Sequence, residues 1–183
     1  RLATKPLNRD FYMRVLLQRF YNLLLVLSCI SMVGALAAIT LNIATRLVNG
    51  WTISGLDGYA GYAIAATLFL ALPSAFLGGD HVRVTILTNK AKGKARDRLD
   101  YLALCAGVAL STYVAWFSCR LVWQSHVFHD VAPTGDATPM WIPQLSMALG
   151  CVGLAVAVCH ALFDKCKYGV FLDERVSGSP SVE

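Results

Sequence analysis

Four long stretches of this chain contain no Lys, Arg, Asp or Glu, and they limit what it can fold into. The stretches are residues 20–45, 58–79, 101–119 and 137–163. A helix needs about 20 mostly apolar residues to cross a hydrocarbon core about 30 Å thick, and each stretch is close to that length or longer. The sequence therefore predicts an all-α integral membrane protein with four transmembrane helices.

The composition supports the same conclusion. Of the 183 residues, 56% are hydrophobic and only 15% are charged, whereas about a quarter of the residues in a soluble domain are charged. The first stretch has no small-residue cleavage site behind it, so we expect a retained span and not a signal peptide. The expected organisation is a cytoplasmic amphipathic segment (1–20), a membrane domain (21–166) with spans at about 21–45, 59–79, 99–123 and 142–163, and a cytoplasmic tail (167–183).

The positive charges predict the orientation. Of the 16 Lys and Arg residues, 14 lie in residues 1–19, 80–100 and 164–183. Short basic segments stay in the cytoplasm, so both termini and the middle loop are expected inside a bacterial inner membrane. Because the basic residues are split among three segments next to spans, we expect them to contact anionic membrane lipids and not nucleic acid.

Local patterns add detail to the first two spans. Residues 8–22 place three arginines among aromatic and aliphatic residues, so an amphipathic helix is expected to follow the inner surface before turning into the first span. The first span carries small residues that permit close helix packing, namely Ser28, Ser31, Gly34, Ala35 and Ala38. Pro73 is expected to kink the second span or loosen its last turn.

Few residues of this chain could take part in ion transfer, catalysis or metal binding. The spans contain almost no charged residues, Arg120 lying near the outer end of the third, and this argues against a translocation path through this chain alone. The six cysteines lie in spans or at their ends without a CxxC pair, and no nucleophile with its base is evident, so no enzymatic activity and no cofactor are predicted. His126 and His129 could ligate a metal with Asp130, but a further ligand is not evident, and an interfacial pair is the preferred interpretation.

One other class of function stays open at this stage. A b-type haem needs two histidines that face each other from different spans, and His81 and His160 both lie toward the cytoplasmic side. The alternative is therefore a haem- or quinone-binding membrane anchor of a redox complex. A stoichiometric Soret band in the purified protein would favour it.

The stretch GGDHVRVTIL, residues 78–87, follows the second span. It resembles a motif of the small permease subunit (DctQ-like) of tripartite ATP-independent periplasmic (TRAP) transporters, with His81 matching and Thr85 standing where Asp is usual. TRLVNGWTISGLDGYAGY resembles the connection before the family's second span, with Arg46 matching and Asp57 near a common Glu. TPMWIPQLSMALG resembles the Pro-Trp motif before the fourth span. The resemblance covers nearly the whole chain.

The resemblance implies a transporter of three parts. A periplasmic solute-binding protein captures a carboxylate-bearing solute, and a large permease moves it, coupled to sodium. The small subunit does not bind the solute itself but braces the permease. Residues in structural or interface roles are then Arg46, Asp57, His81, Arg83, Pro139 and Trp141. The loop expected to help dock the binding protein carries His126, His129, Asp130 and Asp136.

The charge distribution makes a direct prediction of topology. Reporter fusions at residue 90 and at the C-terminus should report a cytoplasmic location, and a fusion at residue 130 should report the periplasm. The opposite pattern of reporter activity would refute the orientation.

Overall fold

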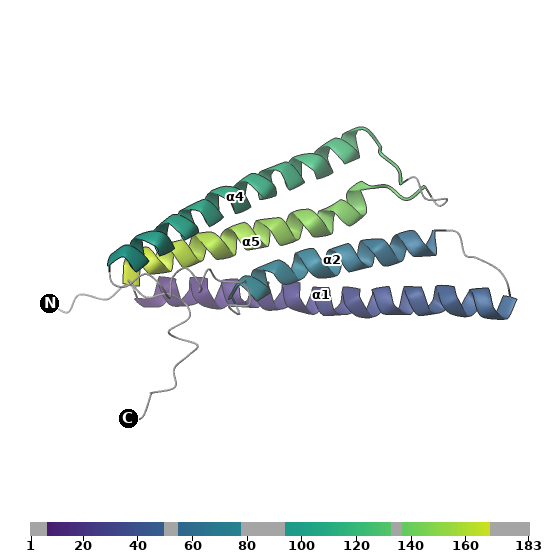
Figure 1. The fold of residues 1–183 in the computed structure, drawn as a ribbon, viewed down its shortest axis with the longest axis horizontal. Coiled ribbons are helices and arrows are strands. Elements are labelled where there is room, and N and C mark those ends of the chain that lie inside the picture. The colour runs from purple at the N-terminus through teal and green to yellow at the C-terminus, as the bar shows by residue number, and fades with distance from the viewer. Residues whose placement is uncertain (1–6, 50–54, 78–93, 133–136, 169–183) are drawn as a thin grey trace, which may run out of the picture.

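Four helices make up the computed structural model, which describes residues 7–49, 55–77, 94–132 and 137–168. They are α1 (Leu7–Asn49), α2 (Leu56–Leu77), α4 (Lys94–Val127) and α5 (Trp141–Tyr168). The helices lie side by side in the order α4, α5, α2, α1 (Figure 1). Within the described residues the extended backbone is limited to an isolated bridge between Val131 and Pro139. The all-α prediction is confirmed.

Each described helix contains an apolar stretch long enough to cross a membrane. These stretches are Val15–Val48, Leu56–Leu77, Tyr101–Val127 and Trp141–Phe163. The prediction of four transmembrane helices is therefore confirmed. The glycines expected to end the second span, and the polar residues after them, lie outside the described residues.

The N-terminal amphipathic segment does not form a separate helix followed by a turn, and this part of the prediction is wrong. α1 continues without interruption from Leu7 to Asn49. The reason is local, because residues 7–33 contain neither Gly nor Pro to interrupt the helix. At about 1.5 Å per residue, 43 residues extend for about 65 Å. That length is about twice a hydrocarbon core of about 30 Å, so part of α1 must extend beyond the core.

The buried face of α1 repeats every seven residues. Its buried and half-buried positions are spaced alternately by three and four residues: Tyr21, Leu24, Ser28, Ser31, Ala35, Ala38, Asn42 and Thr45. A seven-residue repeat of this kind keeps one stripe against an antiparallel or parallel neighbour. Ser28 Oγ donates to the Thr67 carbonyl at 2.8 Å and Ser31 Oγ to the Ala63 carbonyl at 2.9 Å. The stripe therefore packs on α2, whereas Gly34 is exposed and does not contribute.

α4 uses the same repeat against α5. Its buried and half-buried positions on this face are Leu104, Val108, Ser111, Ala115, Ser118, Val122 and Ser125. A Cβ built on Gly107 would lie 3.4 Å from Val158 of α5. In both hairpins about half of these contact positions are Ser or Ala, whose small side chains let helix backbones approach closely in a membrane.

The two hairpins are joined where α2 and α5 touch. Pro73 is fully buried, and α2 continues through it to Leu77. Proline has no N–H, so the Phe69 carbonyl one turn earlier lacks its usual helical donor. A Cβ built on Gly150 of α5 would lie only 2.2 Å from that carbonyl oxygen. A glycine is required there because any larger residue would collide with the backbone of α2.

A second glycine extends this contact to α1. A Cβ built on Gly153 would lie 2.8 Å from Cγ of Pro73 and 2.9 Å from Cδ1 of Leu24. Leu24 has no exposed surface. One turn of α5 therefore meets both α1 and α2, and the junction holds three of the four helices together.

We expect Gly150→Ala to destabilise the protein by about 1–3 kcal/mol, because α2 and α5 must move apart to accept the methyl group. Thermal unfolding of the detergent-purified protein, followed by circular dichroism, measures the effect. Gly61→Ala is the matched control, since nothing lies within 4 Å of a Cβ at that position. Equal melting temperatures for the two variants would contradict the close contact.

Candidate functional site

The predicted candidate residues that the structure describes lie at one end of the helices. We call this end the loop rim; it is where α1 and α4 end, at Asn49 and Val127, and where α2 and α5 begin, at Leu56 and Trp141. It lies to the right in Figure 1, and the loop between α4 and α5 crosses it. The charged and aromatic contacts between helices described below lie there.

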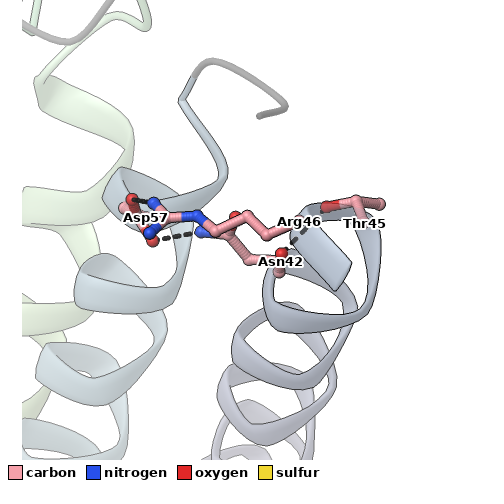
Figure 2. Close-up of polar contacts among 4 residues, drawn as sticks. All are labelled: Asn42, Thr45, Arg46 and Asp57. Carbon is pink, nitrogen blue, oxygen red and sulfur yellow. Dashed lines mark hydrogen bonds and ion pairs between the residues drawn. The ribbon is translucent and has the colours of Figure 1, made fainter. Parts of the chain in front are cut away.

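A three-residue cluster joins α1 to α2 at the loop rim. Figure 2 shows Asn42 and Arg46 of α1 reaching toward Asp57 of α2. The Asn42 amide donates to one Asp57 carboxylate oxygen, and Arg46 Nη2 lies 3.4 Å from the other. Arg46 and Asp57 were predicted as separate candidates, and the structure brings them together.

The helix ends favour this placement. Asp57 lies in the first turn of α2 and Arg46 in the last turn of α1. A negative charge near a helix N-terminus and a positive charge near a C-terminus each interact favourably with the helix dipole. The Arg46 and Asp57 side chains are 57% and 77% exposed, so their direct attraction is weak because water screens it.

Asn42 is the member of the cluster that the sequence-based candidates omitted. It is only 5% exposed, and its Oδ1 atom has no hydrogen-bond partner among the described residues. Thr45 Oγ1 donates to its backbone carbonyl at 2.9 Å. The seven-residue repeat was the signal that could have identified it, because Asn42 follows Ser28 and Ala35 at that spacing.

The described residues on the two sides of the α4–α5 loop are hydrogen-bonded to each other and to α2. Backbone hydrogen bonds run from Ala132 N to the Thr138 carbonyl at 2.8 Å and from Met140 N to the Asp130 carbonyl at 2.9 Å. The Tyr59 hydroxyl of α2 lies 2.9 Å from Thr138 Oγ1. The loop is therefore tied both to itself and to the helix that carries Asp57.

The predicted aromatic and imidazole residues also meet at the loop rim. The ring of His126 lies 5.6 Å from that of Trp141 in an edge-on arrangement, and 6.4 Å from the ring of His129. His129 has a positive φ of 53°, a conformation that non-glycine residues adopt rarely. Pro139 forms the isolated bridge to Val131. The backbone carbonyl of Asp130 accepts the hydrogen bond from Met140 N, and the Asp130 side chain is exposed.

His81, Arg83 and Asp136 lie outside the described residues. Over the described ranges, no group of three or more His, Cys, Asp or Glu is placed to hold a metal ion. His160 lies in the C-terminal part of α5, at the end of the helices that is opposite the loop rim and His126.

The buried interior of the described residues is apolar or weakly polar. Its buried polar side chains are Ser28, Asn42, Ser111, Ser118 and Ser125, and no charged side chain is among them. Many large apolar side chains are exposed instead, for example Leu47 at 81% and Trp123 at 72%. In water that surface would be unfavourable, whereas lipid accommodates it.

Four apolar helices that pack through small residues, with polar contacts confined to one end, define a multi-pass membrane protein. The chain belongs to the family described as tripartite ATP-independent periplasmic transporters, DctQ component, which matches residues 35–167. No curated protein matches the chain at a significant level. The family resemblance is thereby confirmed, and this is a family of transporter components and not of enzymes.

The cluster at the loop rim predicts unequal effects of two substitutions. Asp57→Ala should destabilise the protein by about 1–3 kcal/mol, because it removes the acceptor for a buried amide. Arg46→Ala should cost less than about 1 kcal/mol, because it removes only an exposed ion pair. Unfolding of both variants in the same detergent measures the difference. Equal small effects would show that water satisfies the Asn42 amide.

Proposed function

We propose that the chain is the small, non-transporting membrane subunit of a TRAP transporter in a bacterial inner membrane. It braces a large permease during sodium-coupled, binding-protein-dependent uptake of a carboxylate-bearing solute. The observation that carries the proposal, beside the family membership, is the absence of any charged side chain from the buried interior of the described residues. A charged solute and its coupling ion need polar groups along their path, so the path belongs to another subunit.

The arrangement of the helices supports a bracing role. The row leaves α1 and α4 at its edges, where each packs extensively against one neighbouring helix, whereas α2 and α5 each pack extensively against two (Figure 1). The Gly150 and Gly153 contacts lock α5 against α2 at the centre of the row. Such a sheet of helices presents a broad, fixed surface in the membrane, against which a moving part of the permease can slide.

The exposed side of α1 is the proposed contact with the large permease. A second seven-residue stripe runs along it, made of Ile30, Gly34, Ala37, Leu41, Ala44 and Val48, all of them exposed. Three of the six are Gly or Ala, and nothing lies within 4 Å of a Cβ built on Gly34. Within this chain, stripes of small residues are the surfaces that pack on other helices, and the same rule applies between subunits.

The loop rim is the proposed contact with the periplasmic solute-binding protein. The charge distribution predicts that this end faces outward, because 14 of the 16 Lys and Arg residues lie in the termini and the middle loop. His126, His129 and Asp130 are exposed there. The turn that carries them is fixed to α2 through Tyr59, so it offers a surface that needs little ordering when a partner binds.

Co-purification with the large permease tests the proposal. The tagged chain, co-expressed with the permease encoded in the same genome, should retain it in mild detergent. Gly34→Leu should lower that retention about tenfold, because overpacking a helix contact costs about 1–3 kcal/mol, whereas the isolated chain should keep its melting temperature. Gly34→Ala is the conservative control and should retain the permease.

A second variant separates the two partners. His126→Ala combined with His129→Ala should leave permease retention unchanged and weaken binding of the solute-binding protein to the complex. Solute uptake by liposomes that contain this chain alone would overturn the proposed function. Failure of the tagged chain without substitutions to co-purify the permease would also overturn it.

A further inference from the structure

The outer face of α4 differs from every helix contact described above. It carries Tyr113, Trp116, Arg120 and Trp123, spaced by three, four and three residues on the side opposite the contact with α5. The two tryptophans are 70% and 72% exposed and Tyr113 is 62% exposed. Arg120 is exposed between the tryptophans. Because α4 lies at the edge of the row, none of the other described helices covers this face (Figure 1).

The position of Arg120 along α4 matches a membrane boundary. The stretch from residue 101 to residue 119 carries no charge, and its 19 residues extend for about 28 Å in a helix. A hydrocarbon core is about 30 Å thick, so Arg98 and Arg120 fall at its two edges. Trp123 then lies about one turn toward the loop rim and Trp116 about one turn into the core. Tryptophan is enriched at this depth because its ring is apolar and its N–H is polar.

The side chains of this face favour lipid over protein. Many contacts within the chain use Ser, Ala and Gly, as at Ser111, Ala115 and Gly150, whereas this face presents large aromatic rings that would hold a neighbouring helix away. Arg120 makes no ion pair with any carboxylate among the described residues. A guanidinium at the edge of the hydrocarbon finds its counter-charge in a phosphate, to which it can donate two hydrogen bonds.

We propose that Arg120, flanked by Trp116 and Trp123, binds the phosphate of an anionic phospholipid in the leaflet at the loop rim. The guanidinium contacts the phosphate and the two indole rings lie along the upper acyl chains. The site fixes the depth and tilt of α4, and with it the loop that follows the helix. The inference depends on membrane insertion of α4 and not on the identity of any protein partner.

Quenching of tryptophan fluorescence by brominated lipids tests the site. The full chain, with Trp51→Phe and Trp141→Phe so that only Trp116 and Trp123 report, is reconstituted in phosphatidylcholine vesicles. Brominated phosphatidylglycerol and brominated phosphatidylcholine, with bromine at the same acyl position, are compared at equal mole fractions. We expect the phosphatidylglycerol to associate about fivefold more strongly, the effect of one cation near an anionic surface.

Variants of Arg98 and Arg120 show which of the two arginines causes the preference for phosphatidylglycerol. Arg120→Gln should reduce the ratio of the two association constants to about one, and Arg120→Lys should retain most of it because the charge remains. Arg98→Gln is the matched control, an exposed cation at the other end of the same helix, and should leave the ratio unchanged. Circular dichroism confirms that each variant keeps its helices.

Four results would overturn the proposal. A ratio of one in the unchanged protein, or the same elevated ratio in Arg120→Gln, would show that Arg120 does not select the lipid. Loss of the preference on adding inorganic phosphate at constant ionic strength would assign the site to a soluble anion. Loss of the co-purified permease in Arg120→Gln would assign this face to a protein partner.

Discussion

The close approach of Gly150 to the Phe69 carbonyl is the contact on which the arrangement of the helices depends. The chain forms two antiparallel hairpins, α1–α2 and α4–α5, and this contact joins them through the parallel pair α2 and α5. In a membrane the lipid chains are as apolar as the side chains, so burial of apolar surface does not drive helices together. Close packing of the helix backbones must therefore hold the helices together. It is possible here because Gly150 faces the Phe69 carbonyl, which lacks its usual helical donor because Pro73 has no N–H.

The same requirement explains which surfaces are covered and which are left exposed. Where helices pack within the chain, many contact residues are Ser, Ala or Gly, beside larger ones such as Tyr21, Leu24 and Val108. Ser28 and Ser31 of α1 add hydrogen bonds to carbonyls of α2. Elsewhere the side chains are large and exposed, as on the outer face of α4. The size of the residues therefore distinguishes protein-facing from lipid-facing surfaces. By this criterion the two edges of the row differ, since the exposed stripe on α1 is rich in small residues and that on α4 is rich in aromatic ones.

The sequence predicted the four helices and their class because charge is too costly to place in lipid, so the charge-free stretches had to be the spans. It could not predict that the first span and the amphipathic segment form one helix, because amphipathicity alone does not distinguish a bend from a continuous rod. Arg46 and Asp57 were found one by one, but their meeting through Asn42 depends on how α1 is rotated against α2. That rotation becomes visible only when the seven-residue repeat is recognised. The α4–α5 turn has a similar origin, because its attachment to Tyr59 is a contact across 79 residues of sequence.

The polar contacts at the loop rim contribute more to geometry than to stability. The exposed Arg46–Asp57 pair adds little free energy, and so does a single hydrogen bond such as that between Tyr59 and Thr138. Together, however, they connect α1 to α2, Tyr59 of α2 to Thr138 just before α5, and His126 near the end of α4 to Trp141 at the start of α5. A movement at any one of these helix ends must therefore be shared by the others. In the proposed role, a binding protein that docks on the turn would press on a surface that is continuous with the permease-facing edge of α1, and this continuity makes a fixed brace more consistent with the contacts than a hinged one.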